Sequence, residues 1–138
     1  MRLIRNRSSR DEGVAAVEFA LILPVLALIL FGVLEFGRVW SQYQVFQGAA
    51  REGARCAAVA STSDCVVQTE INQAAAPYGP VPNATITVLG GGGDANGCTD
   101  ADTGKDVQVS WAQPLEVNIP FWSDFSVTPT IKAVFRCE

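Results

Sequence analysis

The sequence predicts an α+β protein with a long N-terminal helix that starts as a membrane span, a short second helix and a small antiparallel sheet of about three strands. Residues 14–34 form an apolar run in which Glu18 is the only charge. Apolar side chains keep a helical spacing after this run. In the second half of the chain, short alternating segments separated by glycine and proline indicate strands.

The apolar run is long enough to cross a bilayer, because about 20 helical residues span about 30 Å of hydrocarbon. Four arginines precede it, namely Arg2, Arg5, Arg7 and Arg10. The flank after the run carries only Glu35 and Arg38. Because arginine and lysine concentrate on the cytoplasmic side of a span, we predict a cytoplasmic N-terminus and an exported remainder.

A cleaved secretory signal is the alternative interpretation, because it also joins a basic segment to an apolar one. The run of 21 residues exceeds the ~7–15 residues of an ordinary signal core. No small-residue cleavage site follows the run, and residues 35–38 continue the helical pattern. These features favour a membrane-spanning helix.

The helical pattern continues over residues 35–60, which we predict to protrude from the membrane as an amphipathic helix. Glu35 with Arg38 and Glu52 with Arg55 are spaced as ion pairs along it. Within the span, Pro24 lacks a backbone N–H, so we expect a kink there.

Residues 61–138 are predicted to form the exported head. Helical spacing from Val66 to Ala75 stops at Pro77, which indicates a short second helix. Alternating segments over residues 84–89, 105–111 and 130–137 indicate three strands. The bulky residues 120–122 and Phe125 are expected to cover one face of the sheet.

Four cysteines lie on the exported side of the span, namely Cys56, Cys65, Cys98 and Cys137. An even number in an oxidising compartment indicates two disulfides. Three pairings are possible; we favour Cys56–Cys65, which would close a turn between helices, and Cys98–Cys137, which would join neighbouring strands.

Composition argues against several functions. From Val14 onward the chain has six basic and twelve acidic groups, a net charge of −6, which is unsuited to nucleic acid. Without any histidine, a serine or cysteine nucleophile lacks its usual base, so we expect neither an enzyme nor a cofactor. Asp100, Asp102 and Asp106 have a spacing that calcium ligands also show, but the EF-hand pattern is incomplete, so a solvated acidic loop is favoured over calcium.

Glu18 needs an explanation, because a charged side chain at the centre of a bilayer costs roughly 2.5–3.5 kcal/mol on insertion scales. Its setting resembles a known family. The sequence from Gly13 to Pro24, then residues 35–38 and residues 49–55, is similar to the TadE-like pseudopilins of the tight-adherence (Tad) pilus system. Residues 133–138 resemble the end of that family more loosely.

The resemblance implies a pilin-like fold and cleavage by a prepilin peptidase after Gly13. Residues 1–13 would be a discarded cytoplasmic leader, and Val14 would become the N-terminus. Glu18, followed by Phe19, would then be the fifth residue and would pair with the N-terminal amine of a neighbouring subunit during assembly. Breaking such a buried pair costs about 3–5 kcal/mol, which would favour one axial register.

The head of 78 residues, 61–138, separates this chain from a major pilin of the same system, which is little more than the hydrophobic helix. We therefore expect a minor pseudopilin of the bacterial inner membrane, with its head in the periplasm or outside the cell, or incorporated in the pilus. Expected partners are the peptidase, other pilin and pseudopilin subunits, the pilus assembly platform and membrane lipid. The alternative is a single-pass anchored binding protein unrelated to pili.

Overall fold

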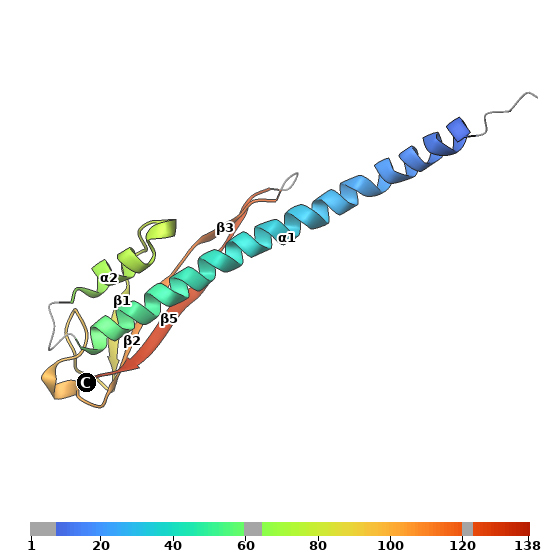
Figure 1. The fold of residues 1–138 in the computed structure, drawn as a ribbon. Helices are drawn as coiled ribbons and strands as arrows, with labels where there is room; N and C mark the ends of the chain where they lie inside the picture. Colours follow the sequence, from blue (N-terminus) through green and yellow to red (C-terminus); the bar gives the residue numbers. More distant parts are fainter. Residues whose placement is uncertain (1–7, 60–64, 120–122) are drawn as a thin grey trace, which may run out of the picture.

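The computed structural model describes residues 8–59, 65–119 and 123–138. Its main feature is one long helix, α1 (Ser8–Ala58), whose C-terminal half carries a small head (Figure 1). At 1.5 Å per residue, the 51 residues of α1 extend over about 76 Å. This architecture confirms the predicted α+β fold and is consistent with a pilin-like arrangement.

Helix α1 begins before Val14 and ends at Ala58, two residues short of the predicted end at residue 60. It includes Pro24 without an interruption of the helix, and a bend there stays a prediction. The exposed N-terminal half of α1 is rich in leucine and alanine, both strong helix formers, so this part is helical without support from packing.

The main sheet has three antiparallel strands in the order β1-β2-β5: β1 (Thr85–Leu89), β2 (Asp106–Ala112) and β5 (Thr130–Arg136). They correspond to the three predicted strands. Central strand β2 alternates along its length, with Val107, Val109 and Trp111 buried and their neighbours more exposed. This period of two gives β2 one apolar face that packs on α1.

A second hairpin was not predicted. Strands β3 (Leu115–Val117) and β4 (Phe125–Val127) pair antiparallel, with Leu115 opposite Val127 and Val117 opposite Phe125. The hairpin lies beside α1 and extends from the sheet toward the N-terminal half of the helix (Figure 1). Phe125 is therefore an exposed residue of this hairpin rather than a cover for the main sheet, while residues 120–122 lie outside the described ranges.

Helix α2 (Val67–Ala74) confirms the short second helix. A 3-10 turn, η1 (Ala76–Tyr78), follows, and another, η2 (Asp100–Asp102), precedes β2. The buried side chain of Ile71 lies against Gly53 of α1, where a Cβ atom would overlap it. A glycine at position 53 therefore allows the two helices to approach closely.

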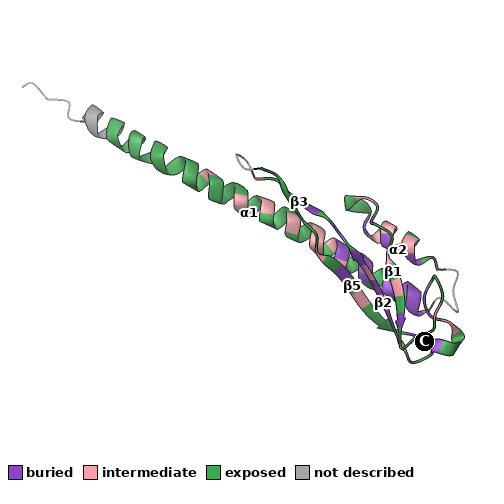
Figure 2. Ribbon diagram, turned by 180° about the vertical axis from the view of Figure 1, so that it is seen from behind, coloured by how far each residue is buried: buried purple, intermediate pink, exposed green. Residues whose placement is uncertain are grey.

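Among the described residues, burial is confined to the C-terminal half of α1 and the head (Figure 2). On α1, the buried or half-buried face repeats every three or four residues from Gly32, through Glu35, Val39 and Phe46, to the last turn. Before Gly32, the described side chains are exposed except for the half-buried Ala27. The predicted amphipathic segment thus uses its apolar face to hold the head.

The structure contains the disulfides Cys56–Cys65 and Cys98–Cys137, the pairing favoured from the sequence. Both disulfides lie near the C-terminal end of α1. There, the N–H of Cys98 donates to the Ala57 carbonyl at 2.9 Å, and the N–H of Glu138 donates to the Ala58 carbonyl at 3.3 Å. The last turn of a helix leaves its carbonyls without helical partners, so these two bonds supply what α1 lacks.

Candidate functional site

Glu18 lies on the exposed part of α1, four residues after Val14 and next to Phe19. Positions four apart share one face of a helix, so Val14 and Glu18 lie one turn from each other. Within the described part of the chain no group forms a hydrogen bond or ion pair with the Glu18 carboxylate. A charged carboxylate without a partner is costly in apolar surroundings.

Among the described residues, one helix is long and apolar enough to cross a membrane, and its apolar window is wholly exposed in the isolated chain. The predicted processing and assembly residues Gly13, Val14, Glu18 and Phe19, together with Pro24, all lie in this window or at its start. All five are exposed, and among the described residues continuous cover by the head begins at Gly32. Their assigned roles stay predictions.

The second cluster lies just after the apolar run and joins α1 to the β3–β4 hairpin. Glu35 and Arg38 form the predicted pair, with Arg38 Nε donating to Glu35 Oε2 at 2.9 Å and Nη2 donating to Oε1 at 2.5 Å. Both residues also reach the hairpin. Arg38 Nη2 donates to the Glu116 carbonyl at 2.7 Å, and the N–H of Asn118 donates to Glu35 Oε1 at 2.8 Å.

This clamp, formed by Glu35, Arg38 and the backbone of Glu116 and Asn118, binds the hairpin at both a carbonyl and an N–H. The Glu35 side chain is only 14% exposed, so its charge needs the partners that it has. The spacing of Glu35 and Arg38 indicated the ion pair itself. Its partners in the hairpin are backbone groups, and because every residue carries such groups, the sequence does not reveal which ones bind. The clamp holds the hairpin against α1 immediately after the apolar run.

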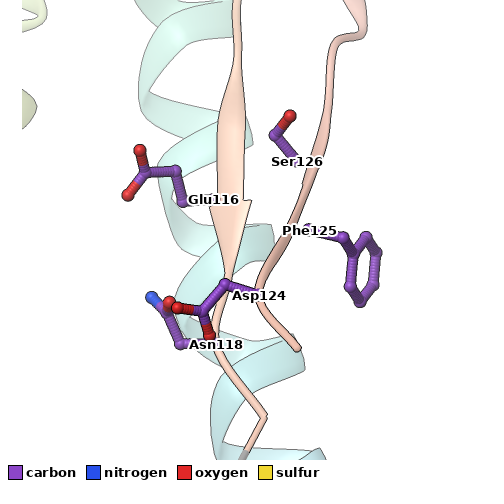
Figure 3. A pocket seen from close by; sticks show the side chains of 5 residues that line it. All are labelled: Glu116, Asn118, Asp124, Phe125 and Ser126. Atoms are coloured by element: carbon purple, nitrogen blue, oxygen red, sulfur yellow. The ribbon is translucent and has the colours of Figure 1, made fainter. Parts of the chain in front are cut away.

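The hairpin has two faces of different chemistry. Glu116, Asn118, Asp124 and Ser126 line a shallow polar pocket of about 280 Å³ together with Phe125, whose ring points away from the polar groups (Figure 3). Odd-numbered residues of both strands face the other way, as the alternation of a strand requires.

An apolar groove of about 330 Å³ lies on that other side, between the hairpin and α1. We call it the hairpin groove. Helix α1 contributes Gly32, Phe36 and Val39, and the hairpin contributes Val117, Phe125 and Val127. Glu35, already held by the clamp, is the one charged residue in its lining, so the groove suits an apolar occupant.

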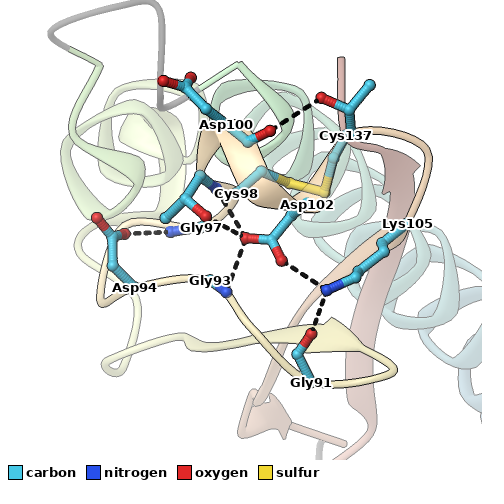
Figure 4. Close-up of a disulfide and its surroundings, with 11 residues drawn as sticks. Gly91, Gly93, Asp94, Gly97, Cys98, Asp100, Asp102, Lys105 and Cys137 are labelled. Atoms are coloured by element: carbon cyan, nitrogen blue, oxygen red, sulfur yellow. Dashed lines mark hydrogen bonds and ion pairs between the residues drawn. A yellow bond between two sulfur atoms is a disulfide. The ribbon is translucent and has the colours of Figure 1, made fainter.

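The acidic loop turns out to be part of the head's internal structure. Asp102 is 1% exposed and accepts hydrogen bonds from Thr99 Oγ1, from the N–H groups of Thr99 and Gly93, and from Lys105 Nζ at 2.9 Å (Figure 4). The prediction that this aspartate is solvated was wrong. Hydrogen bonds from Thr99 above all, then from Lys105 and Gly93, hold the pKa of Asp102 well below its usual range.

The side chains of the three aspartates do not converge on one site. Asp100 and Asp106 are exposed, whereas the oxygens of Asp102 are already used by Thr99, Gly93 and Lys105. Within the described ranges, no group of three or more potential ligands is placed to hold a metal ion. The loop instead fixes the glycine-rich turn after β1, because Lys105 Nζ also donates to the Gly91 carbonyl at 2.8 Å.

A comparison with protein families gives a match, which lies over the apolar half of α1 and most of its C-terminal half. The family model described as TadE-like protein matches residues 13–55, which include Glu18, the clamp residues of α1 and Gly53. This match confirms the resemblance over that segment, whereas the head beyond it lies outside the match. No curated protein and no solved structure matches the chain.

Proposed function

We propose that this chain, whose residues 13–55 match the TadE-like family, is a minor pseudopilin. In this proposal a prepilin peptidase processes it, and it is needed for the assembly or initiation of a Tad-type adhesive pilus. The single observation that carries the proposal is Glu18, a carboxylate on the bare apolar half of α1 that has no partner among the described residues of its own chain.

Cleavage between Gly13 and Val14 would create the missing partner. The new amine of Val14 in one subunit would meet the Glu18 carboxylate of a neighbour, so that two costly charges neutralise each other in an apolar bundle. Both positions are exposed on α1 and accessible to other chains. Gly13 lowers helix stability by about 1 kcal/mol relative to alanine, which eases the local opening that a protease needs.

Anchoring follows from the same helix. Residues 14–34 span the inner membrane with the arginine-rich segment in the cytoplasm, and the head lies in the periplasm before it enters a pilus. The two disulfides, which lie after the apolar run, support an oxidising compartment. The partners in this proposal are the peptidase, other pilin and pseudopilin subunits and the assembly platform.

The head favours a minor subunit over the repeating one. It covers one face of α1 from Gly32 onward, so that face cannot pack against other helices. A repeating subunit of a thin fibre would need this surface. A subunit placed at the start or tip of the pilus needs only the bare half of α1 for contact with the others.

Mass spectrometry of the purified native protein tests processing. We expect a chain that begins at Val14, and a chain that begins at Met1 overturns the proposal in favour of an unrelated anchored binding protein.

Glu18→Ala tests the assembly contact, with Glu52→Ala on the same helix as its matched control. We expect the Glu18→Ala protein to be cleaved normally. Its amount in sheared pili should fall about tenfold or more, since a broken buried pair costs about 3–5 kcal/mol. Normal incorporation would refute the assigned role of the carboxylate.

A further inference from the structure

The hairpin groove straddles the end of the apolar run. Gly32 in its lining belongs to residues 14–34, whereas Phe36 and Val39 follow that segment. At 1.5 Å per residue, these two residues lie about 3 and 7.5 Å beyond Leu34 along the helix. The headgroup layer adds roughly 5–7 Å on each side of the hydrocarbon. The groove therefore lies at the depth of the headgroup layer on the exported side of the membrane.

The chemistry of the hairpin matches that depth. Its groove face presents Phe125 and Val127, each 49% exposed, next to the exposed Phe36 of α1. Its opposite face carries the carboxylates of Glu116 and Asp124, which require water (Figure 3). An element with one apolar face and one charged face is stable at a membrane surface when the apolar face meets lipid.

The clamp removes the main obstacle to such a contact. Glu35 is the charged residue of the groove lining, and its carboxylate is neutralised by Arg38 and accepts the N–H of Asn118. A charge that already has an ion-pair partner and hydrogen bonds can lie near hydrocarbon at a lower cost than a free one. The same bonds hold the hairpin against α1 beside the groove.

We infer that the β3–β4 hairpin is a membrane-surface contact of the head, and that an acyl chain of a phospholipid in the outer interface occupies the hairpin groove. The inference rests on the proposed membrane anchoring. Lipid is the chosen occupant because the groove is continuous with the exposed apolar surface of α1. Before assembly, the head is then seated on the bilayer rather than held away from it.

The test uses the full chain in phosphatidylcholine nanodiscs, with the photoreactive residue p-benzoylphenylalanine at one position at a time. Position Phe125 probes the groove. Position Leu26, exposed within the apolar run, reports on anchoring. Position Phe135, 40% exposed on β5 and paired with Val107 far from the hairpin, is the matched control. The mass of the irradiated protein identifies each adduct.

We expect lipid adducts at Leu26 and Phe125 and none at Phe135. A lipid adduct at Leu26 without one at Phe125 overturns the groove contact and leaves the anchoring intact. Absence of an adduct at Leu26 overturns the anchoring and the groove contact together. A protein dimer from Phe125 shows that a second copy occupies the groove, and it also overturns the inference. If the variant at Phe125 melts at a lower temperature than the parent, Val127, on the same face, replaces it as the probe.

Discussion

The carboxylate of Glu35 accepts a hydrogen bond from the backbone N–H of Asn118, 83 residues later in the chain, at 2.8 Å. Arg38, one turn after Glu35, donates to the Glu116 carbonyl of the same strand region at 2.7 Å. One ion pair on α1 thus binds the hairpin at two points immediately beyond the apolar run. These bonds fix the position of the hairpin relative to α1.

Replacing Glu35 by alanine should loosen the hairpin. The change removes the acceptor of the Asn118 N–H and frees Arg38, and because the clamp is partly exposed we expect a loss of only about 1 kcal/mol in the free energy of unfolding. Amide hydrogen exchange should rise at residues 115–118. Glu52→Ala is the control, since its pair with Arg55 at 3.3 Å is more exposed, and we expect less than about 0.5 kcal/mol from it. Equal effects of the two variants would show that the hairpin contacts add nothing.

Two glycines of α1 should respond to alanine with opposite signs. At Gly53 the new Cβ would overlap Ile71, and overpacking of this kind costs about 1–3 kcal/mol. At Gly48 nothing lies within 4 Å of the place that a new methyl group would take, so alanine should stabilise the helix by up to about 1 kcal/mol. Thermal unfolding measures both. A melting temperature raised by Gly53→Ala would contradict the close packing of α1 on α2.

Asp102 should make the stability of the head depend on acid. Its pKa is lowered in the folded state, so the stabilisation is present above the unfolded value of about 3.9 and is lost as the pH falls toward the lower folded value. Urea unfolding between pH 6 and pH 2 should show this loss. Asp102→Asn should be less stable at pH 6 and should lose less stability on acidification; parallel curves for the two proteins would contradict the prediction.

The two disulfides should differ in their contribution. Cys98–Cys137 closes a loop with a sequence separation of 39, whereas Cys56–Cys65 has a separation of 9. In the chain-entropy account, the Cys98–Cys137 disulfide stabilises the fold by about 4 kcal/mol and the Cys56–Cys65 disulfide by about 3 kcal/mol at 25 °C. Double alanine variants of each pair, compared by urea unfolding, check the order. A larger loss from the Cys56–Cys65 variant would show that loop length does not control the effect.

The elements that the sequence predicted correctly are those in which apolar residues recur at a regular spacing over many residues. Helix α1, helix α2 and strands β1, β2 and β5 each repeat their apolar pattern over enough residues to be read. The β3–β4 hairpin was missed because its strands have three residues each and lie among prolines, which leaves no alternation to detect.

Contacts at the candidate site were harder to predict than elements. The spacing of Glu35 and Arg38 indicated a local pair, but the bond to Asn118 depends on how the head folds back onto α1. For the same reason Asp102 was expected in water, since a sequence of alternating acids does not reveal that Thr99, Gly93 and Lys105 surround one of them.

The head lies alongside α1 rather than at its tip, and the contact face runs from Gly32 to Ala58, about 39 Å at 1.5 Å per residue. A pulling force along the helix therefore acts on this joint in shear. The clamp, the packing against the sheet and the bonds at the last turn of α1 would have to yield together rather than one after another. A joint loaded in shear along its whole length resists tension along α1 better than a joint that can be peeled open from one end.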